Sequence, residues 1–336
     1  MLVTSKDSKN TNDNTVIQED LDRLKNFPIS FFSIIMGLSG FTIAWEKAAH
    51  IMGTPLFIDS FFAWLTFAAF LVISGFYIKK IISHPDAVIA EAKHPVKLSF
   101  FPAASIALLL LSVTMINRAE GLAHVLWILG TALHLVLFLY VVNSWMHHEH
   151  YQTPHISPAW FIPAVGNVLV PIVGMHLGYV EISWFFFSVG IMFWIILFTI
   201  FFNRILFHNP MPTHLVPTFF ILIAPPAVGF VSYVKLNGGL DNFANILFYT
   251  GLFLTLLLFS QYKKFSSLPF FLSWWAYSFP IAAITIASFL MFQLSKNVFF
   301  AYIGGVLLFI LTAVIALLIF KTFKAISKKK VCVESH

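Results

Sequence analysis

Long apolar segments separated by short polar stretches fill the chain from residue 28 to residue 322. A transmembrane helix needs about 20 consecutive, mostly apolar residues. Ten segments meet this requirement, with expected spans of 28–48, 56–79, 97–117, 122–145, 158–178, 182–203, 214–235, 242–262, 268–292 and 297–322. The pattern therefore predicts an all-α integral membrane protein with ten transmembrane helices.

Prolines inside these segments alternate along the chain. A proline in a helix removes an amide donor and clashes with the preceding turn, which is costly where lipid surrounds the backbone. The intramembrane prolines fall only in odd-numbered segments, at Pro102, Pro163, Pro171, Pro217, Pro225, Pro226 and Pro280. Even-numbered segments, above all 182–203, are bulky on every side, as expected of helices that face lipid.

Small residues follow the same alternation at helical spacing. The stripes are Ser33, Gly37, Gly40 and Ala44, then Pro163, Asn167, Pro171 and Gly174, then Pro225, Gly229 and Ser232, and finally Ala276, Pro280, Ala283 and Ala287. One such stripe indicates tight helix packing, but its repetition favours a shared axis. Successive intervals from Pro102 to Pro163, Pro225 and Pro280 are 61, 62 and 55 residues, about the length of a helical hairpin. We therefore expect five hairpins in a quasi-five-fold ring, with odd helices inner, kinked and pore-lining, and even helices outer.

Composition agrees with a membrane protein that has little room for a soluble domain. The chain is 59% hydrophobic and 10% charged, whereas soluble domains have about 25% charged residues. Residues 1–26 are polar and unlike a signal peptide, so we expect a cytoplasmic tail, followed by a membrane domain at 27–323. The basic tail at 324–336 is expected to contact anionic lipid rather than nucleic acid. Cys332 is the single cysteine, which excludes a disulfide framework and a thiolate metal site.

The distribution of Lys and Arg predicts the orientation. With both termini cytoplasmic, sixteen of the 20 Lys and Arg residues lie inside. The four on the outside are Lys47, Arg118, Lys235 and Lys296. This bias follows the positive-inside rule. It predicts a multi-pass protein of the inner or plasma membrane with both termini cytoplasmic.

Charge is absent from the middle of every expected span. All fourteen acidic residues, and all Lys and Arg, lie in tails, loops or helix ends. Proton-coupled pumps generally need an ionisable relay within the membrane, and no carboxylate is available at that depth. An uncharged path can still favour anions, because helix breaks at proline leave amide donors and partial positive helix ends near the axis. Weak binding of this kind favours throughput.

Five motifs occur in order at hairpin spacing. They are PISFFSIIMGLSGFTIAW at 28–45, EAKHPVKLSFF at 91–101, FIPAVGN at 161–167, ILIAPPA at 221–227 and WAYSFPIA at 275–282. Across essentially the whole membrane region, the chain resembles the tellurite-resistance/dicarboxylate transporter family, which includes bacterial TehA channels and plant guard-cell slow anion channels. The resemblance implies a homotrimer in which each protomer holds its own pore, lined by odd helices and wrapped by even ones.

The resemblance also implies a gate, formed by the phenylalanine before the proline of the ninth helix, which is Phe279 here. The residues expected to line the pore are Phe32, Ser33, Gly37, Gly40, Phe101, Pro102, Pro163, Asn167, Pro171, Ala224, Pro225, Pro280 and Ala283. For Phe32 and Phe101, core packing is the alternative. Ser33 stands where relatives often carry Gly, and its hydroxyl either touches the ion or bonds its own helix.

Histidines offer a different chemistry. The stretch MHHEHYQTPH at 146–155 holds His147, His148, Glu149, His150 and His155, residue types that bind Zn²⁺ or titrate near neutral pH. Solvated loop histidines are the favoured interpretation, and we expect no metal site. His134 lies within the fourth span, where we expect a hydrogen bond to a neighbouring helix. It lacks an evident second histidine with which to ligate haem, so no cofactor is expected.

Three functions are compatible with these features. The first is a gated, passive channel for small inorganic or organic anions such as chloride or nitrate, occluded by Phe279. The alternative is a secondary transporter or exporter of C4-dicarboxylates, sulfite or tellurite-related oxyanions, in which His134 or His176 would replace the missing carboxylate relay. An intramembrane enzyme or haem protein ranks last. The expected partners are the transported anions, the lipid bilayer and two further copies of the chain.

Overall fold

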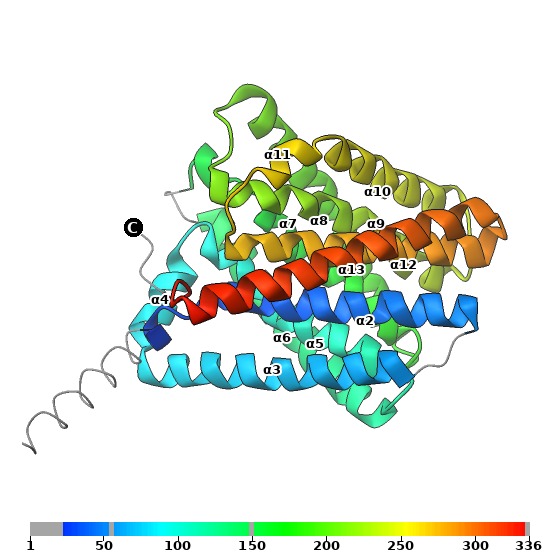
Figure 1. The fold of residues 1–336 in the computed structure, drawn as a ribbon, viewed down its shortest axis with the longest axis horizontal. Helices are drawn as coiled ribbons and strands as arrows, with labels where there is room; N and C mark the ends of the chain where they lie inside the picture. The colour runs from blue at the N-terminus through cyan, green and yellow to red at the C-terminus, as the bar shows by residue number, and fades with distance from the viewer. Residues whose placement is uncertain (1–22, 54–56, 148–150, 333–336) are drawn as a thin grey trace, which may run out of the picture.

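The computed structural model describes residues 23–53, 57–147 and 151–332, and in these residues the chain is helical without any strand. The long helices lie side by side in one bundle (Figure 1). Both ends of the described chain lie at the same end of this bundle, next to α4 (Pro85–Lys93).

Five helices close a ring. These inner helices are α2 (Phe32–Met52), α5 (Pro102–Met115), α7 (Phe161–Gly174), α9 (Ala224–Asn237) and α12 (Ser278–Ser295). Each packs against the next in that order, and α12 packs back against α2. The alternation of prolines along the sequence therefore identified the helices that surround a common axis.

Five longer helices cover the ring. These outer helices are α3 (Phe57–Ser83), α6 (Glu120–His147), α8 (Val180–Phe207), α10 (Asn242–Ser260) and α13 (Val298–Ser327). Each packs on the inner helix that precedes it in the chain, so that the pairs form hairpins. Four of the outer helices run beyond the spans expected for them, as α8 does by continuing to Phe207, whereas α10 ends two residues before the expected 262.

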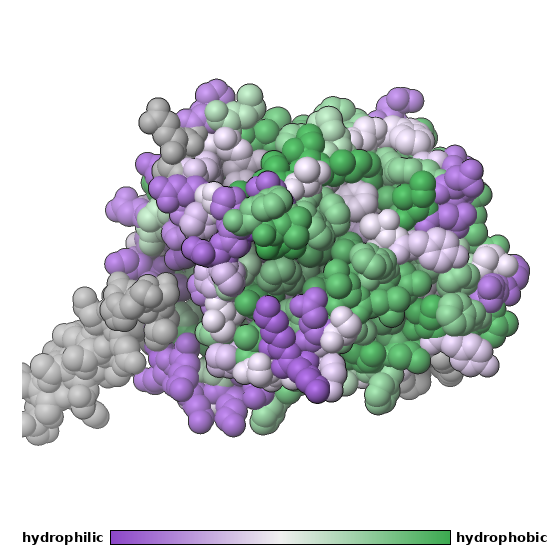
Figure 2. All heavy atoms as spheres, turned by 90° about the horizontal axis from the view of Figure 1, so that it is seen from above, coloured by the Kyte–Doolittle hydropathy of each residue, from purple (hydrophilic) through white to green (hydrophobic). Residues whose placement is uncertain are grey.

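The inner helices are much more buried than the outer helices. In the apolar window of Thr213–Asn237, which contains α9, 94% of residues are buried, against 22% in that of Ser60–Ser83 in α3. Phe309 of α13 is 77% exposed, and large apolar side chains are exposed on all five outer helices. Figure 2 shows a broad hydrophobic area across the middle of the molecule, with hydrophilic residues gathered at the end that carries α4. This surface fits a lipid environment.

Nine segments of the described chain are long and apolar enough to cross a membrane. The remaining inner segment, Pro158–Gly174, is apolar but shorter. The chain is thus a multi-pass membrane protein, while the tenth crossing stays a prediction. The short helices α4 and α11 (Tyr262–Ser266) connect long ones and were not expected from the sequence.

A 3-10 segment precedes the α-helical part of each inner helix. These segments are η1 (Ile29–Phe31), η2 (Lys97–Phe100), η4 (Pro158–Trp160), η5 (Thr213–Ile223) and η6 (Leu272–Tyr277), whereas η3 (Thr153–His155) lies in a connection. The prolines Pro102, Pro163, Pro225 and Pro280 all lie in the first three residues of the following α-helix. A proline costs little there, because the first amides of a helix have no partner within it. The expectation of kinks inside continuous helices is corrected accordingly, although Pro171 does lie within α7.

A buried histidine joins two inner helices. His134 of α6 is fully buried, with Nδ1 2.9 Å from Ser105 Oγ in α5 and Nε2 3.0 Å from the carbonyl oxygen of Pro163 in α7. The hydrogen bond expected between this histidine and a neighbouring helix is confirmed. Gly166 makes room for the imidazole, since a Cβ at this position would lie 1.9 Å from His134 Cε1.

We therefore expect Gly166→Ala to destabilise the protein by about 1–3 kcal/mol, the usual cost of overpacking a core. The matched control is Gly75→Ala in α3, where an added Cβ would meet nothing within 4 Å. Thermal unfolding of the detergent-purified variants measures the difference. Equal melting temperatures for the two variants would contradict the assigned packing.

Candidate functional site

Two cavities lie along the axis of the ring. The N-terminal cavity, of about 150 Å³, lies where the inner helices begin. The C-terminal cavity, of about 310 Å³, lies toward the ends of the same helices. All five inner helices, with their 3-10 segments and following turns, contribute to both linings.

The N-terminal cavity has a mostly apolar wall with a few polar groups. Met36, Phe100, Ile162 and Ile221 represent its apolar part. The polar residues are Ser30, Ser33, Glu91, Lys97, Thr218 and Ser273. Several hydroxyls donate to backbone carbonyls: Ser33 Oγ to the nearby carbonyl oxygen of Ser30 at 2.6 Å, and Ser273 Oγ to that of His214, at the start of η5, at 2.6 Å. Ser33 therefore lines the cavity while its hydroxyl is also bonded within its own helix.

Each inner helix presents one narrow stripe to the C-terminal cavity. The stripes include Gly40, Ile43, Lys47 and His50 of α2, Leu110, Val113 and Asn117 of α5 and its following turn, Leu169, Ile172 and His176 of α7 and its following turn, Val228, Val231 and Lys235 of α9, and Phe279, Ala283, Ile286 and Leu290 of α12. Spacings of three and four residues place each stripe on one helical face. The wall is apolar in its deeper part, and its charged residues lie near the helix ends.

Phe279 lies where the linings of the two cavities meet. Among the described residues, it alone belongs to both linings. Its side chain is only 6% exposed, and it lies in the first turn of α12, directly before Pro280.

Close packing of α2 against α12 positions this phenylalanine. A Cβ at Gly37 would lie 2.1 Å from Ser278 Oγ, and a Cβ at Gly40 would lie 2.8 Å from the Ala282 Cβ and 3.3 Å from Phe279 Cδ2. The two glycines therefore allow α12 to approach α2 at the residues on either side of Phe279. Gly37 serves this contact and lines neither cavity.

The structure brings six of the residues expected in the pore to the cavity walls: Ser33, Gly40, Ala224, Phe279, Pro280 and Ala283. Eight others are absent from both linings: Phe32, Gly37, Phe101, Pro102, Pro163, Asn167, Pro171 and Pro225. Phe100, the neighbour of Phe101, lines the N-terminal cavity instead.

Contacts with outer helices explain several of these differences. The Phe32 ring lies 6.0 Å from that of Tyr77 in α3, measured between centroids. Asn167 Nδ2 donates to the carbonyl oxygen of Pro163 at 2.9 Å, and a Cβ at Gly190 of α8 would lie 2.9 Å from the Asn167 Cβ. The small-residue stripe of α7 is therefore a packing face, and the larger residues on another face of that helix line the cavities.

A buried ion pair lies beside the N-terminal cavity. Lys80 Nζ is 2.7 Å from Glu91 Oε2, and both side chains are buried. Glu91 also accepts hydrogen bonds from the Ile29 amide at 2.8 Å and the Tyr77 hydroxyl at 3.2 Å, while Lys80 donates to the carbonyl oxygen of Phe27 at 2.8 Å. The pair ties α3 and α4 to the start of α2. A carboxylate that lines the cavity thus has its counter-charge directly behind it.

His94 helps to shape the same entrance. Its Nδ1 accepts hydrogen bonds from the amides of Val96 and Lys97, at 3.2 and 3.3 Å. Burial, followed by the positive charge of Lys97, lowers the pKa of His94, so its imidazole is neutral near pH 7. The neutral ring can accept both bonds at the start of η2, which gives the His-Pro motif a structural role.

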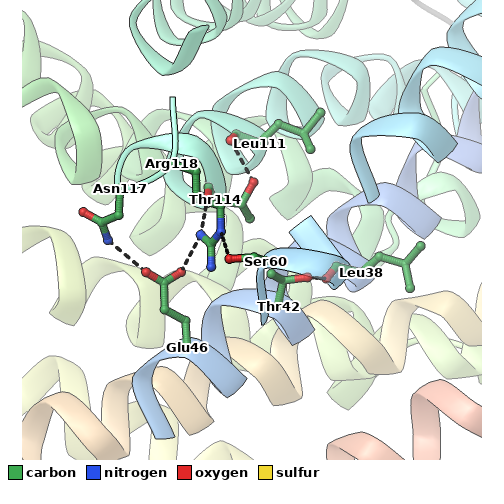
Figure 3. A network of polar contacts seen from close by, with 8 residues as sticks. All are labelled: Leu38, Thr42, Glu46, Ser60, Leu111, Thr114, Asn117 and Arg118. Atoms are coloured by element: carbon green, nitrogen blue, oxygen red, sulfur yellow. Dashed lines mark hydrogen bonds and ion pairs between the residues drawn. The ribbon is translucent and has the colours of Figure 1, made fainter. Parts of the chain in front are cut away.

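The C-terminal cavity contains charges that the sequence had placed only at helix ends. Glu46 Oε1 lies 2.9 Å from Asn117 Nδ2, and Glu46 Oε2 lies 3.1 Å from Arg118 Nη1 (Figure 3). Arg118 Nε donates further to Ser60 Oγ at 3.3 Å. The spacing from Gly40 through Ile43 to Lys47 continues the lining stripe of α2. This spacing could have identified Lys47 as a cavity residue from the sequence.

The histidine-rich stretch is only partly described, since His148, Glu149 and His150 lie outside the described residues. His147 Nδ1 lies 3.0 Å from the carbonyl oxygen of Asn143, and His155 Nδ1 accepts from the Gln152 amide at 3.1 Å. Within the described part of the chain, no group of three His, Cys, Asp or Glu residues is arranged to hold a metal ion.

Comparison with known proteins adds independent information. The S-type anion channel SLAH3 of Arabidopsis thaliana is 30% identical over 272 residues, which cover 79% of this chain and 43% of that protein. The "uncharacterized transporter MJ0576" of Methanocaldococcus jannaschii is 28% identical over 335 residues, which cover 91% of this chain and 95% of that protein. A tellurite resistance protein TehA homolog of Haemophilus influenzae is 24% identical over 263 residues, which cover 76% of this chain and 79% of that protein.

This chain spans about half the length of two of its plant relatives, 43% of SLAH3 and 52% of SLAH2. The family profile described as voltage-dependent anion channel, SLAC1, matches residues 26–323, which include every inner helix and all of the outer helices except the end of α13. The resemblance inferred from the five motifs is thereby confirmed, and the chain belongs to the SLAC1 family of voltage-dependent anion channels.

Proposed function

We propose that the protein is a gated, passive anion channel whose path runs through the two cavities and is closed by Phe279. The observation that carries this proposal is the position of Phe279, which alone among the described residues lines both cavities. The same two cavities are lined by all five inner helices. A rotation of this one side chain would join them into a continuous path.

The electrostatics of the ring favour anions without holding them tightly. All five inner helices begin at the N-terminal cavity, so their partial positive ends point toward it. Around Phe279 the nearest lining residues, Met36, Gly40 and Ala283, carry no charge. An anion there would meet helix dipoles and apolar side chains, which favours fast passage over tight binding.

Passive conduction fits better than proton-coupled transport of C4-dicarboxylates, sulfite or tellurite-related oxyanions. His134, one of two histidines considered for a relay, is hydrogen-bonded between α5 and α7 and lines neither cavity. His176 lines the C-terminal cavity near its mouth. The ionisable residues that line the cavities therefore lie toward the two mouths, and none of the described inner-helix residues next to Phe279 in the linings, such as Gly40, Pro280 and Ala283, could serve as a relay. Uphill uptake driven by a pH gradient in proteoliposomes would instead support the transporter.

The proposal includes an orientation and an assembly. The basic residues near α4, α11 and the end of α13 support a cytoplasmic position for the N-terminal cavity, in an inner or plasma membrane, by the positive-inside rule. The exposed apolar surfaces of the outer helices contact lipid and, in a homotrimer, neighbouring copies of the chain. Chloride and nitrate are the proposed ions.

Phe279→Ala should raise chloride and nitrate flux through reconstituted protein at least about tenfold, equivalent to removing about 1.4 kcal/mol from the barrier. The reason is that truncation connects the two cavities. Phe309→Ala, which removes an exposed ring on α13, is the matched control and should leave flux unchanged. If the Phe279 variant folds like the wild type and its current stays at the wild-type level, the gate assignment is wrong.

The ion pair at the N-terminal cavity gives a second prediction, measured in the Phe279→Ala background at low salt. Glu91→Gln should raise anion flux because it removes a negative charge from the wall, and Lys80→Met should lower it because it leaves that charge uncompensated. Lys80→Met should also destabilise the protein by about 3–5 kcal/mol, as loss of one partner of a buried pair does.

The double variant Lys80→Met/Glu91→Gln separates charge from packing. It should return flux to the level of the Phe279→Ala background and recover part of the lost stability. A fall in flux for both single variants would instead mean that the pair acts only through the fold.

A further inference from the structure

Two lysines line the C-terminal cavity from different inner helices. Lys47 comes from α2 and Lys235 from the last turn of α9, two helices that are not neighbours in the ring. Lys47 is half-buried and Lys235 is exposed. Their positive charges repel each other. Within the described chain, neither ammonium group has a carboxylate within ion-pair distance.

The nearest carboxylate is already engaged. Glu46 precedes Lys47 and attracts it through space. However, its two carboxylate oxygens are held by Asn117 and Arg118 (Figure 3). The Glu46–Arg118 pair is formally neutral, so the two lysines leave a formal charge of about +2 in the cavity, counting each ammonium as one unit at neutral pH.

Helix geometry provides a reason for this excess charge. The five inner helices end around the C-terminal cavity, and each helix end carries a partial negative charge of about half a unit. Without compensation, these ends would repel an approaching anion. Lys235 lies in the last turn of α9 and Lys47 in the turn before the last of α2, close enough to the helix ends to offset part of that field.

Much of the rest of the wall is apolar, although Glu46, His50, Asn117 and His176 also line the cavity. Val231, Ile286 and Leu290 line the cavity with apolar side chains. Each lysine offers three N–H donors, and together they suffice for one small anion. A cavity of about 310 Å³ accommodates such an ion with part of its water shell.

We propose that Lys47 and Lys235 form a capture site in the C-terminal cavity for a monovalent inorganic anion of the nitrate or halide type, one step away from Phe279. This site deepens the proposed channel function and rests on it. The lysines concentrate anions at the mouth, while the uncharged wall deeper in the cavity lets them proceed.

The first test measures nitrate flux in the Phe279→Ala background, entering from the C-terminal side. Lys47→Gln and Lys235→Gln should each lower the flux at about 0.01 M salt, where charges act over about 30 Å. The double variant should lower it about tenfold, within the range by which charged clefts accelerate encounter. At about 1 M salt, where this length is about 3 Å, the difference should vanish.

Lys296→Gln is the matched control, because Lys296 ends α12 at the same end of the bundle but is exposed and outside the cavity lining. It should leave the flux unchanged at both salt concentrations. An equal loss in this variant, or no loss in the double lysine variant at low salt, would overturn the proposal.

A second measurement does not depend on conduction. Bromide in place of gluconate at constant ionic strength should raise the melting temperature of the purified wild-type protein, and the double lysine variant should lose most of this gain. Bromide stabilisation that depends on the lysines, in a protein that conducts no anion, would keep the capture site and overturn the channel. Conduction with lysine-independent bromide stabilisation would keep the channel and overturn the capture site.

Discussion

The requirement that backbone polar groups stay hydrogen-bonded away from water governs this structure. A proline within a lipid-facing helix would leave a carbonyl without a partner, so prolines are confined to helices that are covered by others. Several of them stand at or next to the change from 3-10 to α geometry, as Pro102 and Pro280 do, whereas Pro171 lies within α7. The Ala104 amide, for example, donates to the carbonyl oxygen of Phe101 at 3.1 Å across this change. Backbone pairing thus decides which helices surround the axis, and the position of Phe279 beside Pro280 follows from it.

The same requirement explains how much the sequence could reveal. Lipid exposure and proline tolerance are properties of whole helices, so the inner and outer sets could be predicted from composition alone. The lining face of an inner helix is a finer property. Asn167 and Gly174 are small enough either to line a pore or to pack closely, and the structure places them against Gly190 of α8 and against Trp127 and Ser183 of outer helices. Small residues therefore cannot distinguish the two roles until a neighbour is known.

Charged residues near helix ends were ambiguous for a related reason. Orientation in the membrane requires basic residues outside the apolar slab, so Lys47 and Lys235 first appeared as topological markers. Their positions on the helices show a second role, because both lysines lie on the same helical faces as the residues that line the cavity. The position of Glu91 in a cavity wall could not be predicted for another reason. It lies on α4, a short helix in a stretch that the apolar pattern treats as a connection.

The two mouths of the path solve one electrostatic problem in opposite ways. Parallel inner helices direct their positive ends to the N-terminal cavity and their negative ends to the C-terminal cavity. At the N-terminal cavity the dipoles already favour anions, so a carboxylate such as Glu91 is tolerated when Lys80 neutralises it. At the C-terminal cavity the dipoles oppose anions, and in our proposal Lys47 and Lys235, which have no carboxylate within ion-pair distance among the described residues, offset them. A single sign of charge can therefore be favoured at both ends although the helices are polar, while the apolar section around Phe279 needs no charge of its own.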